Sequence, residues 1–306
     1  MTAGPARASE IGHIDRLDLP APESKSYWRE SWERLRANRI GVLCGVVIVC
    51  LGVVAICAPL ISRYVTHYGY ADQDLSRLFQ PPGRAHWLGT DELGRDTLTR
   101  LIYGSRISLT VGFLTVALSL TVGGTVGLVA GYRGGWLDNL LMRLVDVLLS
   151  IPSIFLFILV TSLLKPNAVT LSCLIALVGW GNVGRLVRGE ALSLRGREFV
   201  IATRSIGAGD VRIVLRHVLP NALPVMIVAA SLAVGQIILI EAALSYLGLG
   251  IQPPVASWGN MLSNAQQYFY HSVWLAVLPG FCIFVTVLCT NIAGNAVRDA
   301  FDPRLG

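Results

Sequence analysis

Long apolar stretches without charge alternate along this chain with short segments rich in arginine. A helix needs about 20 apolar residues to cross the hydrocarbon core of a membrane, and only a segment that satisfies its own backbone hydrogen bonds can cross lipid singly. Between His217 and Val297 the only formal charge is Glu241. The pattern predicts six transmembrane helices, at residues 40–62, 106–131, 146–164, 168–187, 221–247 and 272–295.

Composition points to the same class of protein. Hydrophobic residues make up 53% of the 306 residues and charged residues only 14%, with a mean hydropathy of +0.59, whereas soluble domains carry about a quarter charged residues. The six cysteines all fall in apolar stretches and form no CxxC pair, so we interpret them as packing residues and expect no metal site. The expected fold class is an all-α polytopic membrane protein.

The distribution of arginine and lysine predicts the orientation. Most of them lie in the N-terminal segment, the second and fourth loops and the tail, and positive charge accumulates on the cytoplasmic side of a membrane. We therefore expect a cytoplasmic N-terminal segment at 1–39, an extracytoplasmic loop at 63–105, a core membrane domain at 106–295 and a cytoplasmic tail at 296–306. Arginine on cytoplasmic loops accounts for the net charge of +6, so we expect no nucleic-acid partner.

The N-terminal segment contains no short apolar run, so we expect no cleavable signal peptide and expect the first span to direct membrane targeting. In "YWRESWERLRANR" Trp28, Trp32 and Leu35 share one face and arginines fill the other. This pattern predicts an amphipathic helix lying on the lipid of the inner membrane surface.

Small residues at a spacing of four indicate close helix packing in membranes. They occur on the first and second predicted spans, at Gly41 and Gly45 and at Gly123, Gly127 and Gly131.

The two longer outer loops carry local signals of their own. In the first, we expect a helix to begin after Thr90 as the N-cap, with Asp91 and Glu92 in its first turn. The last outer loop has a proline pair and then a short polar helix. That helix ends in aromatic residues typical of a membrane interface, namely Tyr268, Phe269, Tyr270 and Trp274.

Motifs that would power transport or support catalysis are missing from the sequence. There is no phosphate-binding GxxxxGK[ST] loop, no GxGxxG and no HExxH. Glu241 and Asp146 are the main ionisable residues in or near the spans, and such groups usually face protein or a water path. We interpret Gln236 and Glu241 as candidate residues of a translocation path. The alternative is that Glu241 is a protonated or hydrogen-bonded carboxyl that holds helices together.

The fourth loop, residues 185–220, is basic yet has two apolar stripes. Gly207 and Gly209 let the chain turn sharply, Asp210 can cap the next short helix, and Pro220 falls at the start of the following helix, where proline is tolerated. The first stripe consists of Leu192, Phe199, Ala202 and Ile206, and the second of Val211, Val214, Leu215 and Val218. We expect a helix, a glycine corner and a second helix that docks into a partner, rather than a solvated loop that only sets topology.

This loop resembles the cytoplasmic EAA motif of ATP-binding-cassette (ABC) importer permeases. "IAT" at 201–203 takes the place of EAA, Gly207 follows at the right distance and Leu219-Pro220 closes the motif. The departures are Ile201 for the glutamate, Thr203 for the second alanine and His217 for the isoleucine. Three more stretches, at 86–109, 241–262 and 295–306, resemble the C-type subunit of the dipeptide, oligopeptide and nickel permease family.

The resemblance implies a type I importer-like permease fold with a cytoplasmic coupling helix around Gly207. It implies four partners: a B-type permease, one or two cytoplasmic ATPase subunits, an extracytoplasmic solute-binding protein and membrane lipid. ATP and magnesium would be held by the ATPase, so this chain would bind no cofactor and would not be an enzyme. The implied coupling residues are Ile201, Ala202, Thr203, Arg204, Ile206, Gly207, Gly209, Asp210, Arg212, Leu219 and Pro220.

The resemblance further implies a bacterial cytoplasmic membrane protein that imports short peptides, with nickel complexes or glutathione as alternative cargo. A second hypothesis is an ion-coupled carrier that uses Glu241 and Asp146 as a proton relay. A third, a membrane-embedded enzyme, would need a serine or metal constellation that the sequence does not display.

Overall fold

The computed structural model describes residues 27–265 and 267–301. Apart from one isolated bridge between Thr90 and Asp96, these residues form helices and loops. The helices are α1 (Tyr27–Ala37), α2 (Arg39–Ile56), α3 (Ala58–Ile61), α4 (Thr97–Arg133), α5 (Gly135–Ser150), α6 (Ser153–Leu163), α7 (Ala168–Arg195), α8 (Glu198–Ser205), α9 (Asp210–Ile213), α10 (Leu219–Tyr246), α11 (Trp258–Ala265) and α12 (Trp274–Phe301), with π-helical turns η1 (Ser62–Thr66) and η2 (Val214–Val218).

Five helical segments of the described chain are long and apolar enough to cross a membrane: α2, α4, α7, the run from α9 through α10, and α12. The pair α5 and α6 makes a sixth if it is counted as one span, and it bends by 75° between Ser150 and Ser153. The expected all-α polytopic fold is confirmed. The third predicted span, 146–164, covers the end of α5, a break and α6, because Ile151 is extended and Pro152 is not helical.

Several helices extend beyond the apolar stretch that predicted them. α4 starts at Thr97 rather than near residue 106, and α7 continues to Arg195. α12 runs to Phe301, so the predicted tail at 296–306 begins as the last turns of a helix. Helix ends are set by caps and local hydrogen bonds, which hydropathy does not report. The predictions for 1–26, for 302–306 and for the side chain of Trp28 lie outside the described residues.

The glycine stripe of α4 packs directly against the backbone of α7. A side chain on Gly127 would collide with the main chain of α7 near Gly184 and with Val187, and Gly123 and Gly131 have equally close neighbours on α7. This confirms the close packing expected from their spacing. Gly41 likewise lies against Ala296 of α12. The expectation for Gly45 is wrong, because nothing lies within 4 Å of the position of its missing side chain.

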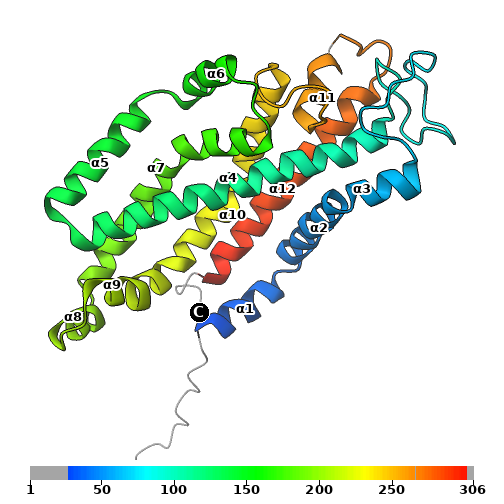
Figure 1. Cartoon of the computed structure of the whole chain (residues 1–306). Coiled ribbons are helices and arrows are strands. Elements are labelled where there is room, and N and C mark those ends of the chain that lie inside the picture. Colours follow the sequence, from blue (N-terminus) through cyan, green and yellow to red (C-terminus); the bar gives the residue numbers. More distant parts are fainter. Residues whose placement is uncertain (1–26, 266, 302–306) are drawn as a thin grey trace, which may run out of the picture.

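The bundle has two distinct ends (Figure 1). α1, the end of α12 and the corner made by α8 and α9 lie at one end, and α6, α11 and the loop between η1 and α4 lie at the other. The main hydrophobic core contains the fully buried Val111, Leu171 and Ile238. A second, smaller core under α8 and α9 contains Val200 and Ile213. This second core fixes the corner to the membrane helices.

Candidate functional site

The corner between α8 and α9 holds the residues that the sequence assigned to coupling. Gly207 has φ of +84°, a conformation in which any side chain is strained, although the space around it is open. Gly209 has φ of −69°, which any residue adopts, so only one of the two predicted hinge glycines is required by the backbone. The chain then continues as one helical run from Asp210 to Tyr246.

Some apolar side chains of the corner are buried against the membrane helices, and other apolar side chains of the corner are exposed. Val200, Ile213 and Val218 are fully buried in the second core. Ile206 is 84% exposed and Val211 70% exposed. The first predicted stripe is exposed at Leu192, Phe199, Ala202 and Ile206, and a break at Gly196 separates Leu192 of α7 from the other three residues, which lie in α8 and at its C-cap. The exposed apolar residues are Phe199, Ile201, Ile206, Val211 and Leu215.

Asp210 does not cap α9 as expected. The N-cap is Gly209, with no side-chain cap, and the Asp210 carboxylate instead accepts a hydrogen bond from the Tyr132 hydroxyl at 3.0 Å. The Arg204 guanidinium lies over the Tyr132 ring, 5.2 Å from its centroid. Tyr132, near the end of α4, therefore joins both sides of the corner, and nothing in its local sequence indicated this role.

The other predicted coupling residues lie on the same short segment. Ile201, Ala202 and Thr203 are in α8, where the Thr203 hydroxyl donates to the Phe199 carbonyl, and Arg212 is in α9. Leu219 and Pro220 are the first residues of α10. The structure thus brings all of them to one projection at the base of a long helix.

Gln236 and Glu241, the two candidate path residues, have different surroundings. Gln236 lines a cavity of about 380 Å³ that is partly open to the surface of the chain. Glu241 is 0% exposed and accepts hydrogen bonds at 2.8 Å from the hydroxyls of Ser108 on α4 and Ser245 on α10. Ser257, beside α11, is a further hydrogen-bond partner. These contacts favour the helix-holding interpretation of Glu241.

Asp146 shares no hydrogen-bond partner with Glu241. Its carboxylate pairs with Arg185 at 2.5 Å, and both side chains are about half exposed. The two carboxyl groups therefore do not form the connected relay that an ion-coupled carrier would use. Among the described residues, no group of three or more His, Cys, Asp or Glu could hold a metal ion.

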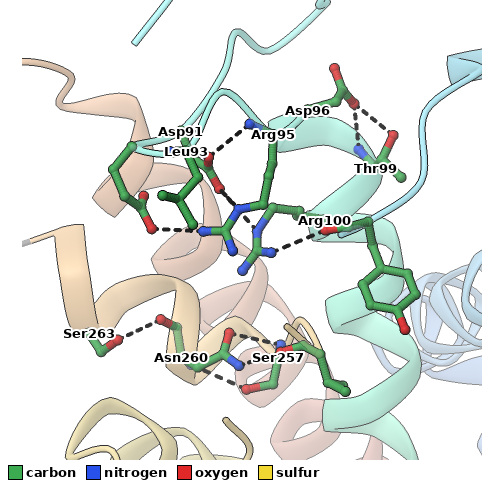
Figure 2. Close-up of polar contacts among 12 residues, drawn as sticks. Asp91, Leu93, Arg95, Asp96, Thr99, Arg100, Ser257, Asn260 and Ser263 are labelled. Carbon is green, nitrogen blue, oxygen red and sulfur yellow. Dashed lines mark hydrogen bonds and ion pairs between the residues drawn. The ribbon is translucent and has the colours of Figure 1, made fainter. Parts of the chain in front are cut away.

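A buried charged network lies at the N-terminal end of α4 (Figure 2). The Asp91 carboxylate accepts from Arg95 Nε at 2.7 Å and lies 3.3 Å from Arg100 Nε. Glu92 accepts from Arg95 Nη2 at 2.7 Å. Asp96, not Thr90, caps the helix by accepting from the Thr99 amide at 2.8 Å. Asp91 and Glu92 precede the helix as parts of this network, so their expected place in its first turn is wrong.

Thr90 itself fixes the loop rather than the helix. Its hydroxyl donates to the Arg77 carbonyl and accepts from the Gln80 amide. α11 packs on α4 beside the network, where the Trp258 indole donates to the Leu101 carbonyl at 3.1 Å. Asn260 donates to the carbonyls of Ile251 and Val255 and so closes the loop before α11. The loops before α4 and before α11 therefore form a folded cap on the membrane helices.

Sequence reasoning also missed a paired interaction near the corner. Arg188 of α7 donates two hydrogen bonds to the Asp138 carboxylate of α5, at 2.5 and 2.7 Å. The two residues are 50 positions apart, so no local spacing could indicate the pair.

Comparison with known proteins identifies the family. Residues 123–306 match the family described as binding-protein-dependent transport system inner membrane component. Residues 26–82 match the N-terminal transmembrane domain of oligopeptide transport permease C. The chain belongs to the binding-protein-dependent transport permeases. The permease is therefore a multi-pass inner-membrane subunit of an ABC importer, which works with ATPase and binding-protein partners and is not itself an enzyme.

Several relatives align with almost the whole permease. It is 41% identical over 290 residues to the dipeptide transport system permease protein DppC of Alkalihalophilus pseudofirmus, covering 94% of each chain. It is 37% identical over 298 residues to the oligopeptide transport system permease protein OppC of Bacillus subtilis, covering 97% of the permease and 95% of the relative. It is 38% identical over 290 residues to the glutathione transport system permease protein GsiD of Pectobacterium atrosepticum, covering 94% and 95%.

A solved structure supports the fold. A chain of the MetNI methionine ABC transporter in an inward-facing conformation matches the permease with a TM-score of 0.53 and 21% identity. The match covers 67% of the permease and 97% of that chain. The type I importer-like fold is therefore confirmed.

Proposed function

We propose that the permease is the C-type subunit of an ATP-driven importer of short peptides in the bacterial cytoplasmic membrane. The observation that carries the coupling part is the corner of α8 and α9. It presents exposed apolar and basic side chains, is rooted in its own buried core, and continues without interruption into α10. A movement of such a projection would be transmitted directly to a membrane-spanning helix, because the helical run is continuous.

We propose that one or two ATPase subunits bind this corner and hold ATP with magnesium, while this chain binds no cofactor. A B-type permease covers α5 and α6, whose exposed apolar residues include Trp136, Val147 and Phe155. An extracytoplasmic binding protein delivers solute to the opposite end. Both termini are cytoplasmic in this arrangement, since α1 and the end of α12 share the end of the bundle with α8 and α9 (Figure 1).

Short peptides are the proposed cargo because relatives at 41% and 37% identity are named dipeptide and oligopeptide permeases. Glutathione is the second candidate, because a glutathione permease aligns equally fully at 38% identity. Nickel complexes remain a further alternative within the family. An ion-coupled carrier is disfavoured by the separate partners of Glu241 and Asp146.

The test is reconstitution of the permease with its partner subunits in vesicles and measurement of peptide uptake with and without ATP. In the same system Gly207→Val should reduce ATP-dependent uptake by at least tenfold while the variant still inserts into the membrane. The reason is that a β-branched residue at φ of +84° must distort the corner.

Gly189→Val is the matched control. Gly189 lies in α7, where nothing lies within 4 Å of the position of its missing side chain, so this variant should transport like the wild type. Normal uptake by Gly207→Val would refute the coupling assignment. Uphill uptake by the purified chain alone would refute the proposed function as a whole.

A further inference from the structure

A cavity of about 380 Å³, partly open to the surface of the chain, lies between α4, α7, α10 and the break that joins α5 to α6. Its volume falls within the range of sites that hold small molecules, roughly 300–1,000 Å³. None of its lining residues is charged. The polar groups that line it are Thr115, Ser119, Ser153, Asn182 and Gln236.

Three of these polar groups lack a partner within the described part of the chain. The Ser119 hydroxyl is buried, with the residue 5% exposed, and has no hydrogen bond. The side-chain amides of Asn182 and Gln236 also make none, and both residues are exposed on the surface of this chain, in charge-free stretches of membrane helices. An unpaired amide facing hydrocarbon costs several kcal/mol. This face of the chain therefore meets a polar environment, such as water, solute or a partner subunit, rather than lipid.

The break in the third span opens onto the same cavity. Ile151 is extended and Pro152 is not helical, and both residues line the cavity and separate α5 from α6. Non-helical backbone at membrane depth is tolerated where it is buried in protein or lines a water-filled cavity. Side chains and main chain thus both indicate an uncharged, water-accessible chamber that opens on one face of the chain.

We propose that this chamber binds the main chain of a short peptide in transit. Carboxamides and hydroxyls both donate and accept hydrogen bonds, as peptide units do, and a neutral lining does not select the charge of peptide side chains. Apolar walls, which include Phe157, Ile175 and Ile237, offer surface to those side chains. The inference rests on the proposed peptide import and assigns Ser119, Asn182 and Gln236 to substrate contact.

The test compares uptake of tri-alanine with uptake of its analogue in which one amide is an ester. Uptake is measured with the reconstituted importer. Each solute saturates the binding protein, so that a difference in its affinity for the two solutes does not affect the comparison. Ser119→Ala, Asn182→Leu and Gln236→Leu should each lower tri-alanine uptake by about 3- to 10-fold, the range expected for loss of a hydrogen bond. ATP hydrolysis stimulated by the binding protein should stay near the wild-type rate. The wild type should prefer the amide, and the double variant Asn182→Leu/Gln236→Leu should lose that preference.

Ser231→Ala and Asn291→Leu are the matched controls. Both polar groups bond to carbonyls of their own helices, at Val228 and Val287, and neither lines the cavity. Their uptake should be unchanged. Wild-type uptake in all three cavity variants, an unaltered amide preference in the double variant, or equal loss of uptake and ATP hydrolysis would overturn the inference. If the wild type itself fails to accumulate tri-alanine with ATP, the proposed function fails instead.

Discussion

At the scale of single residues, Glu241 shows how a polar group is accommodated in a membrane domain. Its carboxyl group is fully buried and accepts hydrogen bonds from serine hydroxyls on two helices. A buried polar group without partners is costly, whereas here each oxygen of the carboxyl group has a donor. The residue therefore joins α4, α10 and the start of α11 rather than lining the central cavity.

Glu241→Gln should keep at least half of wild-type uptake, because the amide still offers an acceptor and the serine hydroxyls can rotate to accept from its nitrogen. Glu241→Leu should destabilise the subunit by about 1–3 kcal/mol for each serine hydroxyl left unpaired. Thermal unfolding in detergent and uptake in vesicles measure the two effects. A steep loss of uptake in Glu241→Gln with unchanged unfolding temperature would place the carboxyl group in the path.

At the scale of elements, Tyr132 of α4 makes polar contacts with both sides of the corner formed by α8 and α9. The Tyr132 hydroxyl donates to Asp210 at the start of α9, and its ring lies under Arg204 of α8. Apolar packing in the second core holds the same elements together. The corner is therefore held against α4 by the apolar packing, and the hydrogen bond fixes its exact position relative to α4.

Tyr132→Phe should leave ATPase binding intact but raise the ATP hydrolysed per peptide imported by about 2- to 5-fold, since the ring stays and one hydrogen bond to a carboxylate is lost. Uptake and phosphate release measured in the same vesicles give this ratio. Tyr64→Phe is the control, because Tyr64 lies on η1 at the opposite end and is largely exposed. An unchanged ratio in Tyr132→Phe would show that this hydrogen bond plays no part in coupling.

At the scale of the whole molecule, α4 connects the two ends. Its 37 residues span about 55 Å at 1.5 Å per residue. One end of α4 carries the buried network of Asp91, Arg95 and Arg100, and the other carries Tyr132 at the coupling corner. The folded loops before α4 and α11 and the corner of α8 and α9 are thus attached to the same long helix. That helix packs along α7 through its glycines.

Arg95→Gln should destabilise the permease by about 3–5 kcal/mol, because it removes the buried guanidinium shared by the buried Asp91 carboxylate and the partly buried Glu92 carboxylate. Arg77→Gln, which breaks an exposed pair with Asp74, should cost at most about 1 kcal/mol. The two variants are compared by their thermal unfolding and by the protease sensitivity of the 63–96 loop. Similar stability of the two variants would contradict a structural role for the network.

The sequence by itself determined the membrane class, the approximate position of five spans and the sharp turn of the fourth loop at Gly207. These features are local: each span needs only a run of apolar residues, and a positive φ needs only a glycine. Tertiary structure decided which face of α8 is buried, how the third span breaks, and where the polar groups are paired. Tyr132 and Asp210 lie 78 positions apart, and Ser108 and Glu241 lie 133 apart. Such contacts depend on how helices pack, and no spacing along a single helix contains that information.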